Sequence, residues 1–239
     1  MQLSTLMQEL SLLRHDSAFD YTLKKMGIWS IWEDIQRNNP SGNNPYHNNP
    51  HMKYMARVAY ELYCLTNLIG GHFIPDEAIT IVLAGLVHDA DHSGGVYTDD
   101  SDNIAQARTF LAGLRLRHPY IADHIWNDVD TLVQSTRFPH TSTHGFHHLE
   151  GYVRDADFMY SLEIYSLNPI MHGIPEELVH KLGKLLTPSQ FVDPQQAFMN
   201  HAVFHTHAGS HIWAQCKDKA FELEQNYALG TLKSVKTLP

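Results

Sequence analysis

The chain reads AITIVLAGLV at residues 78–87, and this apolar run ends at His88 and Asp89. The Pro-Asp-Glu of residues 75–77 precedes it. Proline fits the first position of a helix, and acidic side chains complement the positive N-terminal end. The sequence therefore predicts a buried helix that ends at the His-Asp pair. Side chains at a helix end can converge on one point, and an imidazole with a carboxylate suits a borderline or hard divalent metal ion.

Helical periodicity of apolar residues recurs along the rest of the chain, whereas strand alternation does not. Residues 38–49, rich in asparagine and proline, are predicted to form a loop. Pro175, Pro188 and Pro194 are expected to separate two or three helices towards the C-terminus. Apolar spacing predicts further helices over 1–13, 19–32 with a break near Gly27, 51–68, 104–114 after an aspartate-rich cap, 121–133 after Pro119, 152–159 and 213–229.

These patterns predict one all-α domain over residues 1–239. We expect its core at about 45–160. N-terminal helices within 1–37 and C-terminal helices within 175–232 would then extend this core at its two ends.

Composition excludes several classes of protein. The formal net charge of −9, from 17 basic and 26 acidic residues, argues against nucleic-acid binding, because a surface that follows phosphates needs a basic excess. Cys64 and Cys216, the two cysteines, fit unpaired thiols in a reducing compartment. Residues 1–13 lack the pattern of a signal peptide, and no apolar run reaches the ~20 residues of a membrane span. We expect a soluble, cytoplasmic protein without a membrane partner, and the oligomeric state stays open.

Candidate metal ligands lie on three different predicted helices. His51 begins one helix, His88 and Asp89 end the next, and a third carries aspartates in the Arg-Asp-Ala-Asp of residues 154–157. A metal site in the core of a helical bundle draws its ligands from facing helices in this way. This order of histidine, His-Asp and aspartate resembles the HD-domain superfamily of metal-dependent phosphohydrolases. The resemblance implies an HD-domain helical bundle with N- and C-terminal helical extensions.

Two motifs make the resemblance more specific. Residues 46–51 read YHNNPH and are similar to the YHNxxH signature of class I cyclic-nucleotide phosphodiesterases. Residues 88–94 read HDADHSG and are similar to the HDxDHxG of the same enzymes. The resemblance implies metal ligation by His51, His88 and Asp89, proton donation to the leaving oxygen by His47, and a place beside the metal centre for His92.

The last metal ligand of the superfamily is an aspartate that follows alanine and precedes an apolar residue. The Ala-Asp-Phe of residues 156–158 resembles that step, so Asp157 is preferred to Asp155 as the ligand. Asp155 is then expected to support the site from behind the ligands, together with Asn48 and Asp91.

Other stretches depart from the phosphodiesterase pattern. Residues 99–107 contain no glutamate, although the resemblance implies one in a supporting role after the His-Asp loop. The glutamine with which those enzymes grip a purine has no counterpart that we can identify. Residues 136–140, Thr-Arg-Phe-Pro-His, instead resemble small microbial HD hydrolases, in which a helix ends in a threonine near the site. Lys53, Arg137 and His140 are candidate contacts for the substrate.

We therefore expect a metal-dependent phosphohydrolase that uses metal-activated water to cleave a phosphate ester of a small molecule. A nucleotide is the favoured substrate, which leaves a phosphodiesterase and a nucleotidase open. Asp89 can bridge two ions, so the cofactor is one or two divalent ions, and the ligand types do not distinguish Mn, Mg, Zn, Fe, Co and Ni. The alternatives are an HD-fold di-iron oxygenase, which needs two more histidines such as His118 and His140, and a non-catalytic nucleotide-binding protein. His205 and His207 are expected to be structural.

Overall fold

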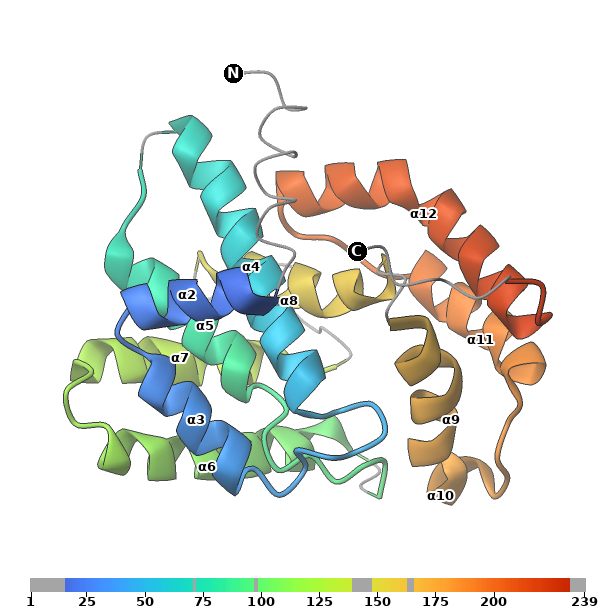
Figure 1. The fold of residues 1–239 in the computed structure, drawn as a ribbon, viewed down its shortest axis with the longest axis horizontal. Coiled ribbons are helices and arrows are strands. Elements are labelled where there is room, and N and C mark those ends of the chain that lie inside the picture. The colour runs from blue at the N-terminus through green and yellow to red at the C-terminus, as the bar shows by residue number, and fades with distance from the viewer. Residues whose placement is uncertain (1–15, 71, 97–98, 139–147, 163–165, 233–239) are drawn as a thin grey trace.

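A computed structural model describes residues 16–70, 72–96, 99–138, 148–162 and 166–232. These residues fold into helices without a strand, which confirms the predicted all-α class (Figure 1). The helix expected over 1–13 lies outside the described residues. None of the helices within these ranges is long and apolar enough to cross a membrane.

The helices gather in two groups with α8 between them (Figure 1). The first group and α8 comprise α2 (Asp16–Lys25), α3 (Trp29–Asn38), α4 (Asn49–Gly70), α5 (Pro75–Val87), α6 (Asp100–Arg117), α7 (Asp123–Ser135) and α8 (Glu150–Met159). A 3-10 helix, η2 (Tyr160–Leu162), and a π-helix, η4 (Pro169–Gly173), lead into the second group. That group comprises α9 (Ile174–Glu177), α10 (Val179–Leu182), α11 (Pro188–Asn200) and α12 (His207–Ala228).

Most predicted helix boundaries agree with the structure, and three are wrong. Helix α12 begins at His207 and not near residue 213. Gly27 breaks the chain between α2 and α3 with a φ of 74°, as predicted. The helix expected after Pro119 begins only at Asp123, because the Ile121 N–H first bonds to the His118 carbonyl in a turn. Pro194 lies inside α11 and does not end a helix. It is exposed, so water can hydrogen-bond the carbonyl for which proline has no N–H.

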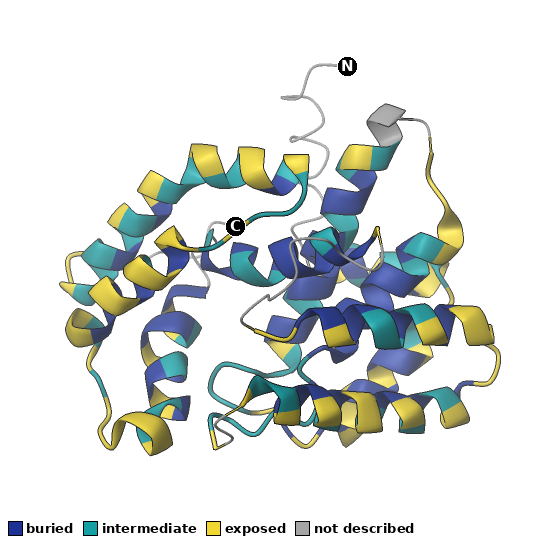
Figure 2. Ribbon diagram, turned by 180° about the vertical axis from the view of Figure 1, so that it is seen from behind, coloured by how far each residue is buried: buried dark blue, intermediate teal, exposed yellow. Residues whose placement is uncertain are grey.

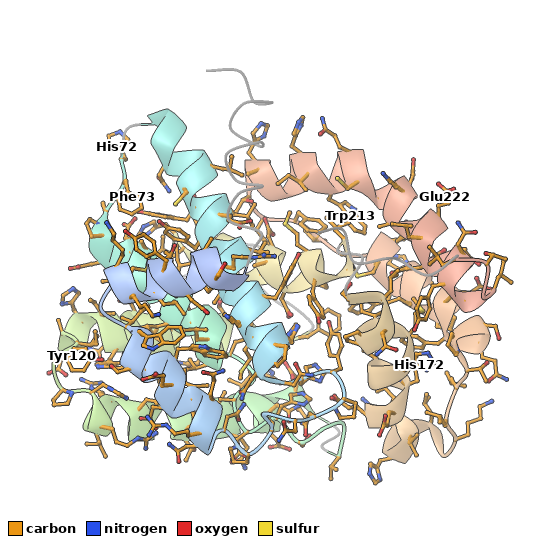
Figure 3. All side chains as sticks on the ribbon, viewed as in Figure 1. His72, Phe73, Tyr120, His172, Trp213 and Glu222 are labelled. Atoms are coloured by element: carbon orange, nitrogen blue, oxygen red, sulfur yellow. The ribbon has the colours of Figure 1, made fainter. Side chains whose placement is uncertain are left out.

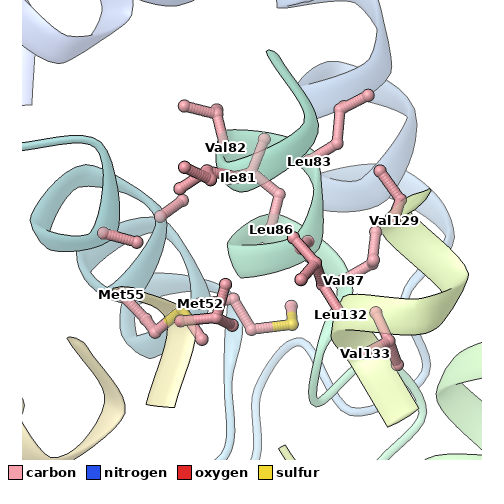
Figure 4. Packing of buried hydrophobic residues seen from close by; sticks show 14 of the residues in the cluster. Met52, Met55, Ile81, Val82, Leu83, Leu86, Val87, Val129, Leu132 and Val133 are labelled. Carbon is pink, nitrogen blue, oxygen red and sulfur yellow. The ribbon is translucent and has the colours of Figure 1, made fainter. Parts of the chain in front are cut away.

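Helix α5 is the centre of the fold. Residues 80–87 are buried on every side of the helix, and Figure 4 shows side chains of α5 between those of α4 and α7. At Gly85, a Cβ atom would lie 2.4 Å from the Cα atom of Ala56 on α4, so glycine is needed for this close approach. The contact fixes the end of α5, and with it His88 and Asp89, against α4.

The main core begins earlier in the chain than the expected residue 45. Phe19 on α2 and Trp32 on α3 are buried in the same cluster as the side chains of α4 to α8. The C-terminal helices have a second, smaller apolar cluster, to which η4 contributes Ile170 and α11 contributes Phe191. The outer faces of α11 and α12 are exposed (Figure 2). The C-terminal helices thus form a layer that packs against the main core.

Asp155 ties this layer to α8. Its buried carboxylate accepts hydrogen bonds from the N–H groups of His205 and Thr206, at 2.7 and 2.8 Å, and from the Thr206 hydroxyl at 2.6 Å. Thr206 is also the residue that caps α12. Trp213 lies on the inner side of α12 and Glu222 on its outer side (Figure 3). The start of α12 is therefore held by one carboxylate of the main core.

Glu224, on the inner side of α12, is fully buried, and among the described residues Gln196 is its polar neighbour, without a hydrogen bond of good geometry to either carboxyl oxygen. Burial raises the pKa of Glu224 to about 7. The unfolded chain loses this proton at a lower pH than the folded protein does. Glu224 therefore does not reduce the free energy of unfolding below the unfolded pKa of ~4.3, where it is protonated in both states. The folded protein loses stability as the pH rises towards 7.

We expect Glu224→Gln to stabilise the protein at pH 8. The gain in free energy of unfolding should grow from pH 5 to pH 8 towards about 3 kcal/mol, since glutamine never takes the buried charge. Urea denaturation at the two pH values measures it. Glu222→Gln is the control, because Glu222 is exposed on the same helix. Equal stability of Glu224→Gln and wild type at pH 8 would contradict the expectation.

Candidate metal centre

The four predicted metal ligands lie together where α4, α5 and α8 meet. His51 belongs to the first turn of α4, His88 and Asp89 follow α5, and Asp157 lies on α8. Nε2 of His51 lies 3.2 Å from Oδ2 of Asp89 and 3.3 Å from Oδ1 of Asp157. Nε2 of His88 lies 2.9 Å and 3.8 Å from the same two oxygen atoms.

These separations are those of atoms that share one metal ion. Ligand atoms ~2.1 Å from an ion lie ~3.0 Å apart at neighbouring corners of an octahedron and ~3.4 Å apart in a tetrahedron. The four nitrogen–oxygen distances fall between 2.9 and 3.8 Å. His51, His88 and Asp157 are thus positioned to bind one metal ion, and Asp89 lies beside both imidazoles.

The hydrogen bonds of the imidazoles also fit a cation at this point. Nδ1 of His88 donates to the Gly85 carbonyl at 2.9 Å, which leaves the lone pair of Nε2 on the side of Asp89. Nε2 of His51 and Nε2 of His88 are buried, and neither has a hydrogen bond of good geometry to another described residue. A lone pair opposite a carboxylate oxygen is repulsive unless a cation or a proton lies between them.

The charges of the site favour positive charge in the same place. Burial would lower the pKa of His51, but the carboxylates of Asp157 and Asp89 outweigh burial and raise this pKa to about 9. Burial would raise the pKa of Asp89, yet His88 beside it holds that pKa well below its usual range. Protons and metal ions therefore compete for the two imidazoles.

The asparagine-rich loop of residues 39–49 holds the ligand-bearing segments together. Oδ1 of Asn48 accepts a hydrogen bond from the His51 N–H at 3.0 Å and caps α4, so it fixes the turn that carries this ligand. Oδ1 of Asn39 accepts from the Asp91 N–H at 2.8 Å, where a φ of 60° turns the chain after α5. Asn48 and Asp91 thus lie behind the ligands, Asp91 through its backbone.

His47 lies beside the ligands without being one of them. It precedes α4, and its ring centroid is 6.0 Å from that of His51. Nδ1 of His47 is hydrogen-bonded to the carboxylate of Glu177 on α9. The same carboxylate accepts from the N–H groups of Tyr46 and His47, at 2.7 and 2.9 Å. Because Nδ1 is held in this way, Nε2 is the nitrogen of His47 that remains for chemistry.

Sequence reasoning missed Glu177. Burial would raise the pKa of Glu177, but its hydrogen bonds with His47 lower it, so it is a carboxylate that accepts from that ring. The glutamate beside the site thus comes from the C-terminal layer and not from residues 99–107. Glycine at residue 95, with a φ of 83°, permits this packing, because a Cβ atom there would lie 2.0 Å from the Glu177 carbonyl oxygen, but no local sequence pattern points to Glu177.

His92 stacks on His47, with ring centroids 3.7 Å apart and ring planes at 25°. Nδ1 of His92 accepts a hydrogen bond from the Gly94 N–H at 3.1 Å, so its proton is on Nε2. Burial and then the neighbouring His47 lower the pKa of His92 to about 4, which keeps this ring neutral. His47, His92 and Glu177 are also spaced as ligands. This group suits a metal ion less well, because His92 and Glu177 already accept N–H donors.

A cavity of about 430 Å³ opens from the ligands. Its polar lining contains the ligands His88, Asp89 and Asp157 with His47 and His92. Its apolar lining includes Phe138, Phe158 and Phe198, whose ring centroids lie 5.3 to 6.4 Å apart. The remaining lining includes Asp100, Ile104, Thr136 at the end of α7, Leu178, Phe191 and Gln195.

The expected substrate contacts lie elsewhere or outside the described residues. Nζ of Lys53 pairs with Asp20 at 2.7 Å, because two residues after His51 the side chain points to another side of α4. Arg137 is exposed and lies 3.4 Å from Asp99. Neither Lys53 nor Arg137 lines the cavity. His140 lies outside the described residues.

The expected support of Asp157 by Asp155 is wrong. Successive helical residues are rotated by ~100°, so two carboxylates two positions apart point in different directions. Asp157 faces His51 at 3.3 Å, whereas Asp155 holds the start of α12. Asp157 therefore belongs to the metal site, whereas Asp155 stabilises the fold.

We expect Asp157→Asn and Asp155→Asn to differ in kind. Asp157→Asn should lower metal affinity and leave the melting temperature of the metal-free protein near that of wild type. Asp155→Asn should keep metal affinity and lower the free energy of unfolding by ~1–3 kcal/mol, because a buried N–H loses its acceptor. Metal titration and thermal denaturation of both variants measure the two effects. The opposite ranking in the titration would make Asp155 the ligand.

No protein-family model and no curated protein matches this chain.

Proposed function

We propose that the protein is a metal-dependent phosphohydrolase that cleaves a phosphate ester of a small molecule. The observation that carries the proposal is the set of two buried imidazole nitrogens and two carboxylates with ligand-like spacing, beside an imidazole held by Glu177. A divalent ion held by His51, His88, Asp89 and Asp157 would bind phosphate oxygens and lower the pKa of a bound water molecule towards neutrality.

His47 would supply the proton that hydrolysis needs at the leaving oxygen. The oxygen of water forms a new bond to phosphorus, the ester P–O bond breaks, and the departing oxygen takes the proton from Nε2 of His47. The proton that water releases restores the imidazolium. Glu177 orients the ring for this role, because its carboxylate is hydrogen-bonded to Nδ1 and leaves Nε2 for the substrate. His92 keeps Nε2–H as a donor for a phosphate oxygen.

The cavity favours an ester with an aromatic group and a single phosphate. Phe138, Phe158 and Phe198 offer ring faces and edges against which a nucleobase can pack. Among the described residues that line this cavity, none is lysine or arginine. The phosphate would therefore rely on the metal centre and the two histidines, which suits a monoester or diester better than a triphosphate.

The di-iron alternative has less support. His118, which that reading requires as a ligand, lies 2.8 Å from the carboxylate of Asp34. Arg117 donates to the same carboxylate at 2.7 Å, and these residues do not line the cavity. His140 lies outside the described residues. A non-catalytic binding protein would have no need for the pairing of His47 with Glu177.

Metal analysis of protein purified without added metal, followed by a substrate screen, tests the proposal. The screen covers nucleotides, cyclic nucleotides and generic phosphodiesters with Mn²⁺, Mg²⁺ and Ni²⁺. We expect hydrolysis of a phosphate ester that a chelator abolishes and added metal restores. Two bound irons with visible absorption would favour the oxygenase, and metal binding without hydrolysis of any ester would contradict the proposal.

A further inference from the structure

We propose that the substrate is an open-chain phosphodiester with one aromatic arm and one anionic arm, and that Lys181 binds the anionic arm. The inference rests on the proposed phosphohydrolase function and names the substrate class of the same site.

A second cavity, of about 190 Å³, borders the same two histidines as the larger one. His47, His92, Asp100, Ile174 and Leu178 line both cavities. A substrate bound at His47 therefore has space on both sides of this histidine. A phosphodiester has the matching shape, because its phosphorus carries two ester groups. A monoester would leave one space without a substrate group, and a cyclic diester joins both ester oxygens to one sugar.

The walls of the two cavities differ in chemistry. Phenylalanine rings line only the larger cavity, whereas Asn103, Glu177 and Lys181 line only the smaller one. Lys181 lies on α10 and is the one lysine or arginine among the described residues that line either cavity. The smaller cavity therefore favours a polar arm with a negative charge.

The acidic groups near the smaller cavity are already engaged. Glu177 is hydrogen-bonded to His47, and Oδ2 of Asp100 accepts from the Phe138 N–H at 2.6 Å. Lys181 supplies the ammonium group of this lining with which an incoming anion can pair. The smaller cavity has less than half the volume of the larger, so it takes the smaller arm and the aromatic group takes the larger space.

Two esters of adenosine 5′-monophosphate test the inference. The carboxymethyl and 2-hydroxyethyl esters are similar in size and differ in one negative charge. We expect wild type with Mn²⁺ to prefer the carboxymethyl ester by about fivefold in kcat/KM, the factor that ~1 kcal/mol from one exposed charge pair gives. Lys181→Ala should bring this ratio to about one, and Lys181→Arg should keep the preference. Lys184→Ala, at an exposed lysine outside both cavity linings, is the control and should leave the ratio as in wild type.

The outcomes separate the two proposals. If wild type hydrolyses neither ester, nor 3′,5′-cyclic AMP, nor any ester of the screen, the proposed function fails. If it hydrolyses both esters at equal rates, or if the ratio survives in Lys181→Ala, the function stands and the anionic arm is wrong. If it hydrolyses 3′,5′-cyclic AMP and neither open ester, the open-chain class is wrong.

Discussion

Asp89→Ala is expected to fold, to retain no metal ion and to hydrolyse no phosphate ester above background. Oδ2 of Asp89 lies 2.9 Å from Nε2 of His88 and 3.2 Å from Nε2 of His51, so it joins the two imidazoles in one ligand set. Loss of a group that only supports a ligand typically costs ~10–100-fold in metal affinity, and loss of a ligand costs more. The reaction then loses the several kcal/mol that the ion contributes to the transition state.

Elemental analysis of Asp89→Ala purified without added metal measures the first effect, and turnover of the best ester from the screen measures the second. Asp102→Ala is the matched control, because Asp102 is an exposed aspartate of α6 outside the cavity lining. Circular dichroism separates loss of metal from loss of fold. Full metal content and turnover in Asp89→Ala would overturn the assignment of the whole site.

The sequence predicted the features whose cause is local. The apolar run of residues 78–87, with proline and acids before it, forms α5 and ends at His88, as expected. His51 and Asp157 were selected because short motifs surround them, and the helices that carry these motifs pack on α5 or next to it. The local sequence patterns predict these positions correctly because the helices that carry them pack around one buried helix, α5.

Features that depend on distant contacts were not predictable in the same way. Glu177 is separated from His47 by 130 residues, and only the packing of the C-terminal layer brings them together. The asparagine-rich residues 38–49 were identified as a loop by composition. Their role in holding Asp91 comes from a side-chain hydrogen bond across 52 residues, which no local pattern reveals. Lys53 was predicted as a substrate contact because of its charge. In the structure its side chain forms an ion pair with Asp20 instead.

His47→Ala should keep the metal ion and lose turnover selectively, depending on the leaving group. Its ring centroid is 6.0 Å from that of His51, and its Nδ1 is bonded to Glu177, so His47 is not part of the ligand set. An alkoxide leaving group needs a proton as the P–O bond breaks, and a positioned acid contributes ~10²–10⁴ in rate. p-Nitrophenolate needs little protonation, so the loss on p-nitrophenyl esters should be much smaller.

Glu177→Gln should show the same selectivity with a smaller loss, because an amide oxygen can still accept from the backbone N–H groups, but the amide no longer offers a second oxygen to Nδ1 of His47. Glu176→Gln is the control, since Glu176 is the exposed neighbour on α9. The measurement is kcat on an alkyl and on a p-nitrophenyl ester of the same phosphate, with metal content of each variant. An equal loss on both esters with metal retained would make His47 a phosphate ligand and not the proton donor. Loss of metal would make it a metal ligand, and the hydrogen bond to Glu177 would then serve to orient that ligand, as carboxylates behind metal-bound histidines do.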